Sequence, residues 1–596
     1  MCGIAGSFHF VNQKSSILNI DELVEIRDSM YMRGPDSYGL WFSKDDNVAL
    51  AHRRLSIIDI SELGSQPMKS KDGNIVIVFN GEIYNYLELK INLEKKGYLF
   101  HSKTDTEVLI NLYIEYGLDF VNHIRGMFSI ALWDNIKKGI LLVRDHFGIK
   151  PLYYSEHDGE ILFASQVKAL LKSKKIDKSL SYAGQVSYFL WGSIQDPFTL
   201  YNGIKALEAG TYMWVTKNGE KEIKNYYNLS KKIIEIENSS INYTSKLDFD
   251  LLKRTFDDTV SKHLLSDVPV GLFLSSGLDP SILAEFSSNK INNIKAITLN
   301  YENKFNESEL ANKTAIQFNL NHKNYNISKS EIKGEFDKIM NYMDQPSIDG
   351  INTYFISKYA VKSGLKVAIS GLGGDELFRG YNTFKRTKKL VDIFSILSFF
   401  PIQGLTNVTL NLNKSLNSKL QFIAKYSGTY PGSYLLQRSL FLPEQLYDFM
   451  DKEIVSEGLL QLRNINKLND IIEGIYNNKS KISALEFTMY MRNQLLRDSD
   501  WAGMAHSLEI RVPFVDKILF EQSISILSSN KTLNKSQIFS KISNLNNDYF
   551  KRKKTGFSFP KVNQILSNED KSRNELEQNK ASSKIIFYKY KNCISI

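Results

Sequence analysis

The stretch VGLFLSSGLDPS, residues 270–281, decides the fold of the second half of this chain. Its apolar run has the length of a strand, the Ser-Ser-Gly that follows marks a tight loop, and a helical pattern comes next. The same order returns in KVAIS (366–370), which continues as GLGGDELF (371–378). Two such strand–loop–helix units predict a doubly wound, parallel α/β sheet that binds a ligand at the carboxyl ends of its strands.

The first ~215 residues follow another pattern, with short strands expected at Ile75–Phe79, Phe128–Trp133 and Ile140–Val143 and a helix at Thr106–Tyr116. Sheets packed together with helices outside predict an α+β layered domain. We therefore divide the chain into an α+β domain (residues 1–215), a polar linker (216–245), an α/β domain (246–560) and a tail without an assigned role (561–596). Residues ~385–480 lack glycine-rich loops and are expected to be helical additions.

Bulk composition narrows the class of protein. The 596 residues are 42% hydrophobic and 23% charged, which is ordinary for a globular protein. No run of about 18 apolar residues predicts a membrane span, and the N-terminus lacks the basic region of a signal peptide. Two cysteines cannot build a disulfide framework, so a cytoplasmic location is expected. The net charge of +10 comes from scattered lysines, with one dense run at Lys551–Lys554, so no nucleic-acid partner is expected.

Cys2 follows the initiator methionine directly. Removal of Met1 would leave Cys2 with a free α-amino group, which titrates at about pH 7.7–8.0 in model peptides. That amine can serve as the base for the thiol, as in enzymes with an N-terminal nucleophile. The alternative is an incidental buried cysteine, because free cysteine often behaves as a small hydrophobe.

The surrounding strings favour the chemical interpretation. MCGIAG (1–6), RGPD (33–36), AHRRLSIID (51–59), FNGEIYN (79–85) and RDHFGIKPLYY (144–154) resemble, in order and spacing, the class II glutamine amidotransferase domain, which has the N-terminal nucleophile hydrolase sandwich fold. The resemblance implies that Cys2 attacks the carboxamide of L-glutamine and that Asn80 and the Gly81 N–H stabilise the oxyanion. It places the glutamine α-carboxylate on Arg54 and the α-ammonium on Asp105, which could also be a helix N-cap. Further matching glutamine positions are Leu55, Ser56, Ile57, Ile58 and Glu82.

The second half resembles two related patterns. FLSSGLDPS (273–281) is similar to the pyrophosphate loop of ATP pyrophosphatases, which lack a Walker A motif. Together with SGLGGDELF (370–378), SD (499–500), MAHSLEIRVPFVD (504–516) and KKTGF (553–557), it resembles the asparagine synthetase domain over about residues 248–560. The resemblance implies ATP and Mg²⁺ as cofactors, with Asp279 and Asp375 as the metal carboxylates. The implied nucleotide positions are Leu274, Ser275, Ser276, Gly277, Asp279, Ser281, Leu299, Ser370, Gly371 and Lys535, with Lys541 as the rival of Lys535.

Two residues depart from the family pattern. Pro280 stands where a serine is usual, which removes a hydroxyl and an N–H donor from the phosphate loop. Leu372 stands where established asparagine synthetases carry a glutamate that takes part in handling ammonia, and leucine cannot move a proton. Either Glu376 replaces that glutamate, or the acceptor is not aspartate.

The sequence therefore predicts a ligase of the asparagine synthetase type. Glutamine is hydrolysed at Cys2, ammonia passes through an internal channel, and a carboxylate, by default L-aspartate, is adenylated by ATP and amidated. The alternative within this class is a uronic-acid sugar in polysaccharide biosynthesis. Two other classes stay open: a tRNA-modifying enzyme and a non-catalytic relative that acts as a binding protein. A homodimer is a candidate assembly.

Overall fold

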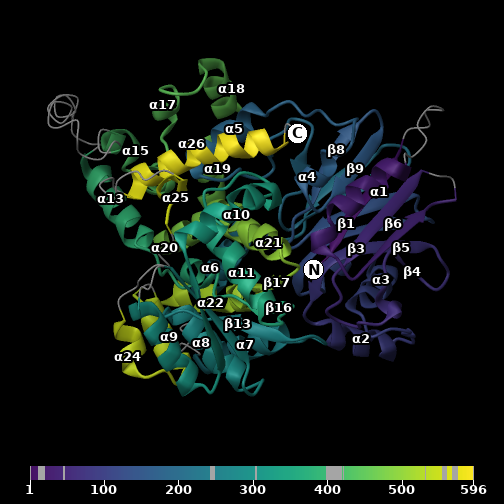
Figure 1. The fold of residues 1–596 in the computed structure, drawn as a ribbon, viewed down its shortest axis with the longest axis horizontal. Coiled ribbons are helices and arrows are strands. Elements are labelled where there is room, and N and C mark those ends of the chain that lie inside the picture. Colours follow the sequence, from purple (N-terminus) through teal and green to yellow (C-terminus); the bar gives the residue numbers. More distant parts are fainter. Residues whose placement is uncertain are drawn as a thin grey trace.

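The computed structural model describes residues 2–10, 20–44, 47–241, 249–301, 305–397, 419, 422–530, 532–552, 560–566 and 575–594. Figure 1 shows two bodies packed side by side. The purple and blue N-terminal body contains two sheets, and the teal, green and yellow remainder surrounds a third sheet. The KKTGF string, Met1 and part of the basic run Lys551–Lys554 lie outside the described residues.

The N-terminal body is a sandwich of two antiparallel, six-stranded sheets within the described ranges. In spatial order, the first sheet consists of β10 (Lys205–Ala206), β8 (Tyr153–His157), β9 (Glu160–Ala164), β1 (Gly3–His9), β3 (Val48–Arg54) and β2 (Ser37–Phe42). The second consists of β12 (Lys221–Asn225), β11 (Thr211–Thr216), β7 (Gly139–Arg144), β6 (Gly126–Asp134), β5 (Ile75–Ile83) and β4 (Met68–Lys69).

Alternation along the strands builds the layers of this sandwich. Ile4 and Phe8 on β1 meet Val76 and Val78 on β5 in the core between the sheets. The opposite face of the second sheet packs on α3 (Asp105–Tyr116), and that of the first packs on α1 (Ile20–Ser29). The helix–sheet–sheet–helix order confirms the predicted N-terminal nucleophile hydrolase fold. Shorter helices in this body are α2 (Tyr86–Lys95), α4 (Val167–Leu170) and α5 (Tyr182–Trp191).

The C-terminal body is built on a parallel sheet, which confirms the doubly wound α/β prediction. Its strands are β15 (Asn321–Ile327), β14 (Lys295–Tyr301), β13 (Val270–Phe273), β16 (Val367–Ile369) and β17 (Glu509–Arg511), in that spatial order. The order of connection reverses between β13 and β16, so the loops after these two strands open a crevice at their carboxyl ends. The principal helices around the sheet are α7 (Phe249–His263), α8 (Leu278–Ser288), α9 (Phe305–Gln317), α10 (Lys329–Tyr342), α11 (Ile351–Lys362), α12 (Gly374–Leu377), α22 (Lys517–Ser529), α23 (Lys535–Ile542) and α24 (Asn547–Lys551).

The expected helical additions form the green part of Figure 1. They are α13 (Thr383–Leu397), α15 (Ile423–Tyr426), α16 (Tyr430–Arg438), α17 (Pro443–Leu446), α18 (Lys452–Leu462), α19 (Asn464–Ile472) and the start of α20 (Asn478–Leu485). The helical part continues beyond the predicted range as the π-helix η6 (Glu486–Leu496) and α21 (Arg497–Met504). A π-helix of this kind is rare and often accompanies a functional site. Within the described ranges, no helix is both long and apolar enough to cross a membrane.

Two segments differ from their prediction. Residues 216–245 are not a simple linker, because β12 completes the second sheet and α6 (Leu229–Ile241) packs against α22. The segment 561–596 is not a loose tail, since α25 (Val562–Leu566) and α26 (Glu575–Ile594) are folded. Tyr188 of α5 donates to the Ser583 carbonyl of α26 (3.0 Å), and Tyr590 of α26 donates to the Asp344 carbonyl.

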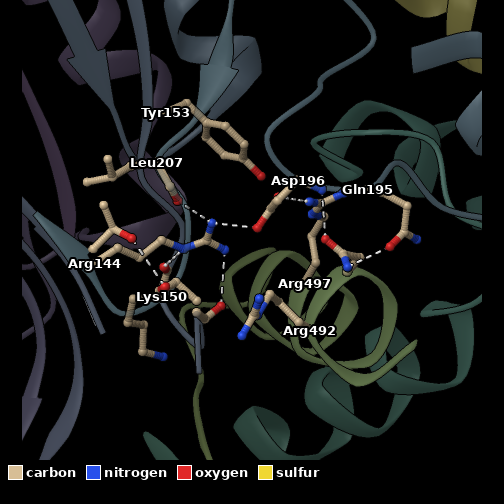
Figure 2. Close-up of polar contacts among 12 residues, drawn as sticks. Arg144, Lys150, Tyr153, Gln195, Asp196, Leu207, Arg492 and Arg497 are labelled. Atoms are coloured by element: carbon tan, nitrogen blue, oxygen red, sulfur yellow. Dashed lines mark hydrogen bonds and ion pairs between the residues drawn. The ribbon is translucent and has the colours of Figure 1, made fainter. Parts of the chain in front are cut away.

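Buried ion pairs join the two bodies (Figure 2). Asp196, in the loop after α5, accepts from Arg144 of β7 (2.8 Å) and from Arg497 of α21 (2.7 Å). The same loop docks on the π-helix, because Asn493 accepts from the Asp196 N–H (2.9 Å) and donates to the Gln195 carboxamide (2.7 Å). The N-terminal sandwich and the helical additions are therefore fixed to each other by buried ion pairs and hydrogen bonds.

Candidate active sites

Cys2 lies at the start of β1, in a small pocket of about 30 Å³. Its backbone nitrogen, which becomes the α-amino group once Met1 is removed, donates to Asn80 Oδ1 at 2.9 Å. Asn80 is fully buried on β5, and its Nδ2 donates to Ser129 (3.3 Å). Burial raises the pKa of the Cys2 thiol, while the N-terminal ammonium and Arg54 act in the opposite direction. The thiol therefore depends on a nearby base to become a nucleophile.

Most of the predicted glutamine positions line this pocket. The wall includes Cys2, Arg54, Leu55, Ile57, Ile58, Gly81, Glu82 and Asp105. Ser56 is outside the wall, and its N–H donates to Asp36 (2.8 Å). Asn80 lies behind Cys2 rather than in the wall. The structure adds Gln66, which accepts from the Phe79 N–H (2.6 Å) and donates to Thr106 (3.2 Å). No sequence signal identified Gln66, because it reaches the pocket from a separate loop.

Arg54 and Asp105, which are predicted to bind the charged groups of glutamine, make different kinds of contact in the structure. Arg54 donates to the carbonyls of Ser61 (2.8 Å) and Asp59, so it also fixes the loop around the pocket. Asp105 is the first residue of α3, and Thr104 is the N-cap in its place. The Asp105 carboxylate instead accepts from the Ile83 N–H (3.0 Å). Burial is the main cause that raises the pKa of Asp105 to about 7.

A second cavity, of about 280 Å³, lies at the crevice between β13 and β16. Of the predicted nucleotide positions, its wall contains Leu274, Ser275, Asp279, Leu299, Ser370 and Gly371. Ser276, Gly277 and Ser281 are not in the wall. Ser281 is fully buried and donates to the Gly277 carbonyl (2.8 Å), as a hydroxyl in the first helical turn readily does. The rival Lys541 is exposed, away from both cavities.

Asp279 and Asp375 both line this cavity. Lys535 Nζ donates to Asp279 Oδ2 and to Asp375 Oδ1 (2.7 Å). Glycines allow the approach: a Cβ on Gly374 would lie 2.4 Å from Asp279 Oδ1, and one on Gly380 would lie 1.9 Å from Asp375 Oδ1. Two carboxylates that share one cation fit Mg²⁺, which commonly uses one or two carboxylates and completes its shell with phosphates and water. No cluster of three or more acidic, His or Cys side chains suited to a metal occurs in the described ranges.

Leu372 and Glu376 both line the cavity. Glu376 is buried, and Tyr381 donates to its Oε1 at 2.8 Å. Burial raises the pKa of Glu376 to about 7, with Asp375 adding to the effect. The wall also contains residues to which sequence reasoning assigned no role, because they come from β13, β14, α11, the loop before α13 and the π-helix: Phe273, Thr298, Asn352, Thr353, Ile356, Tyr381 and Leu495.

Two motifs from different halves of the chain meet between the cavities. Arg33, from the RGPD string, donates to the Cys2 carbonyl (3.1 Å) and forms a bidentate pair with Asp500 of the SD string (2.7 and 3.2 Å). Arg511 pairs with Glu509 (2.6 Å) and approaches Glu82 of the first pocket (3.4 Å). Its carbonyl accepts from the Ser370 N–H in the second cavity (2.8 Å). Arg511 therefore contacts residues of both sites.

Comparison with known proteins agrees with this arrangement. Residues 1–227 match the family model of the glutamine amidotransferase domain, and residues 251–589 match that of asparagine synthase. The chain is 32% identical over 551 residues to asparagine synthetase (glutamine-hydrolyzing) 1 of Bacillus subtilis, which covers 90% of this chain and 82% of that protein. It is 31% identical over 477 residues to putative asparagine synthetase (glutamine-hydrolyzing) 2 of Methanocaldococcus jannaschii, covering 76% and 88%. It is also 30% identical over 413 residues to amidase chry2 of Gibberella zeae, covering 65% and 60%.

A glutaminase-type pocket and a switch-point cavity in one chain define a glutamine-dependent amidotransferase. The chain belongs to the asparagine synthase family and is a carbon–nitrogen ligase of the glutamine-hydrolysing asparagine synthase type.

Proposed function

We propose that this enzyme amidates a carboxylate through an acyl-adenylate, with ammonia that it releases from glutamine. The default acceptor is L-aspartate, and the products are then asparagine, AMP, pyrophosphate and glutamate. The observation that carries the proposal is the meeting of Asp279 and Asp375 at one cation, beside a cavity walled by Ser275, Ser370 and Gly371. The parallel sheet supplies this crevice at its switch point.

At the first site, the chain's own residues account for glutamine hydrolysis. The Cys2 thiol passes its proton to the Cys2 α-amino group and attacks the carboxamide carbon. The Gly81 N–H and Asn80 are the proposed donors to the oxyanion that forms, Asn80 once its Nδ2 turns from Ser129 toward the pocket. Fixed donors of this type contribute ~3–4 kcal/mol each in comparable enzymes. The α-amino group returns the proton to the leaving ammonia, and water hydrolyses the thioester to glutamate.

At the second site, the acceptor carboxylate attacks the α-phosphorus of ATP and pyrophosphate leaves. Bound Mg²⁺ would neutralise phosphate charge between Asp279 and Asp375. Ser275, Ser370 and Gly371 bind and orient the nucleotide, while the apolar side chains of Leu274 and Leu299 exclude water from it. Ammonia then attacks the acyl carbon, AMP leaves, and Glu376 with its Tyr381 partner is the pair in the wall that can accept the proton.

A sugar carboxylate is the second candidate acceptor, and Leu372 favours it. This side chain lies in the cavity wall near Ile356 and Leu495, where an apolar surface can pack on a bulky acceptor that lacks an α-ammonium group. One relative of similar identity is named an amidase and not an asparagine synthetase.

The deciding experiment measures pyrophosphate release and amide formation with ATP and glutamine, for L-aspartate and for nucleotide-linked uronic acids. Efficient asparagine formation by the wild type would exclude the sugar acceptor. Asp279→Asn and Asp375→Asn should abolish pyrophosphate release and leave basal glutaminase activity at Cys2. Normal pyrophosphate release by either variant would contradict the metal role of these carboxylates.

A further inference from the structure

We propose that Lys535 is a resident counter-ion that occupies the divalent-cation position between Asp279 and Asp375 until the nucleotide arrives. The inference rests on the proposed metal role of the two carboxylates and adds an order of events to it. In this order, Mg²⁺ and ATP enter together, and the lysine ammonium transfers from the carboxylates to the phosphates.

The geometry of the triad supports this exchange. A single Nζ donates to one oxygen of each carboxylate, so the ammonium stands where a metal shared by both would stand. The three side chains are mostly buried, with 11% of Lys535, 14% of Asp279 and 16% of Asp375 exposed. Screening by solvent is therefore weak, and the pairing is stronger than a surface ion pair.

The backbone of Lys535 is anchored while its side chain is long enough to move. Lys535 is the first residue of α23, whose N-terminus is closed by a reciprocal pair between Asn534 and Gln537 (3.0 Å in each direction). Phe539 fixes the same helix against Phe378, with ring centroids 5.0 Å apart. A swing of the lysine stem can therefore move the ammonium without moving α23.

The place of this lysine on its helix is itself unfavourable. A cation in the first turn opposes the positive end of the helix dipole, and such positions usually hold acidic residues. Lys535 gains its stability from the two carboxylates instead of from the helix. The same carboxylates, without that ammonium, would repel each other and attract a metal ion.

Lys535 and a metal ion compete for the two carboxylates because both are cations. An ammonium and a divalent cation held by the same two carboxylates repel each other at short range, so Lys535 weakens metal binding to the nucleotide-free enzyme. Phosphate oxygens change the balance, because they complete the metal shell and give the displaced ammonium a new anionic partner. Metal affinity should therefore depend strongly on nucleotide in the wild type and weakly once the lysine charge is removed.

The test is a titration of the purified full-length protein with Mn²⁺, followed by the electron paramagnetic resonance signal of the free ion. Without nucleotide, Lys535→Gln should bind Mn²⁺ at least about tenfold more tightly than the wild type, because a nearby like charge is gone. Lys452→Gln is the matched control, since Lys452 also opens a capped helix, α18, and is exposed. It should bind Mn²⁺ as the wild type does. Asp279→Asn in the Lys535→Gln background should remove the gain.

A second titration, with a non-hydrolysable ATP analogue, separates the counter-ion role of Lys535 from the metal role of Asp279 and Asp375. The analogue should tighten Mn²⁺ binding by a larger factor in the wild type than in Lys535→Gln. Equal nucleotide-free affinity in these two proteins, with circular dichroism spectra that match, would overturn the counter-ion role. If the analogue produces an Asp279-dependent site in that case, the metal assignment stands alone. If no protein shows such a site even with the analogue, the metal assignment fails as well.

Discussion

Cys2 is the proposed nucleophile of the glutaminase half, and its backbone nitrogen donates to Asn80 Oδ1 at 2.9 Å. We expect Cys2→Ala to abolish glutamine-dependent amide formation and to preserve amide formation from ammonium salts. The reason is that the second cavity does not contain Cys2. Parallel assays with each nitrogen source measure this directly. Retained glutamine use in the variant would show that another group is the nucleophile.

Asp105 should give the glutamine reaction a dependence on pH near neutrality. Its raised pKa, about 7, means that the carboxylate is ionised above that pH and protonated below it. Only the ionised form can pair with the glutamine α-ammonium, so below pH 7 kcat/KM for glutamine should fall about tenfold more per pH unit in the wild type than in Asp105→Asn, where the Cys2 α-amino base still titrates. Ammonia-dependent activity, corrected for the fraction of free ammonia, is the control and should lack both limbs. Equal slopes in the wild type and in Asp105→Asn below about pH 7 would contradict the role of Asp105.

Sequence motifs predict site residues that are close together in the chain. They do not predict residues that only the tertiary fold brings to the site. Cys2, Arg54 and Gly81 could be identified because each sits in a short string with a chemical logic. Gln66 and Tyr381 reach the two cavities from separate loops, and no local pattern marks them. Ser281 lies in a motif, but its hydroxyl is directed back to the Gly277 carbonyl within the helix.

Helix α8 shows how an element tolerates the departure at Pro280. The helix begins at Leu278 after the N-cap Gly277, so Pro280 lies in the first turn, where backbone N–H groups have no partner within the helix. Pro280 also lines the second cavity. We expect Pro280→Ser to leave stability nearly unchanged and to lower the KM for ATP about two- to tenfold, the value of one added hydrogen bond.

Steady-state kinetics with varied ATP would measure this effect. Pro443→Ser is the matched control, because Pro443 opens helix α17 and is not part of either cavity wall. It should leave the KM for ATP unchanged. An unaltered KM in Pro280→Ser would mean that this position makes no phosphate contact.

The π-helix η6 positions the far wall of the second cavity. Glu486 at its start is fully buried and pairs with Arg438 (2.8 Å), whose guanidinium lies over the rings of Tyr381 (4.5 Å) and Tyr490 (4.1 Å). Tyr381 in turn contacts Glu376 in the cavity. We expect Arg438→Met to raise the KM for the acceptor about tenfold, from the loss of cation–π and positioning contacts, with a smaller change in the KM for ATP.

The experiment must separate the effect of Arg438→Met on the stability of the protein from its effect on the position of Tyr381. Arg438→Met leaves the buried Glu486 unpaired, which typically costs ~3–5 kcal/mol. Adding Glu486→Gln should recover much of the stability, measured by thermal unfolding, without restoring the KM for the acceptor. Full recovery of that KM in the double variant would reduce Arg438 to a structural role.

Sequence patterns predict elements well where the residues are apolar and buried, and poorly where they are polar and exposed. The strands β5, β6 and β7 contain the predicted strands as apolar runs, because both faces of their sheet are packed. The predicted linker contains the edge strand β12, which no sequence pattern marks because all five of its residues are exposed and carry no apolar period. No local sequence pattern marks the π-helix, and its Asn493 is held by contacts far apart in the chain, since it accepts from the Asp196 N–H of the other body and donates to the Thr488 carbonyl.

The whole molecule depends on buried charges that cross between its two bodies. Asp196 is the clearest case, since its carboxylate stands between Arg144 and Arg497 and its backbone is held by Asn493 (Figure 2). Such contacts lie between residues about 50 to 300 positions apart in the chain. Motifs could predict both bodies, but they could not predict how the bodies join, because the joining residues carry no shared pattern.

We expect Asp196→Asn to destabilise the folded protein by ~3–5 kcal/mol at neutral pH, because two buried guanidiniums lose their anion. Burial alone would raise the pKa of Asp196, but Arg144 and Arg497 outweigh it and lower that pKa below the ordinary 3.8. The carboxylate therefore stabilises the fold fully above that ordinary value, and the contribution disappears as the pH falls through the lower pKa of the folded state. Chemical denaturation at a series of pH values should show the variant approaching the wild type only in acid. Glu156→Gln, which removes the exposed partner of Lys221 (2.7 Å), is the control and should change stability by less than ~1 kcal/mol at any pH. A deficit in Asp196→Asn that persisted unchanged in acid would show that the carboxylate charge is not what joins the two bodies.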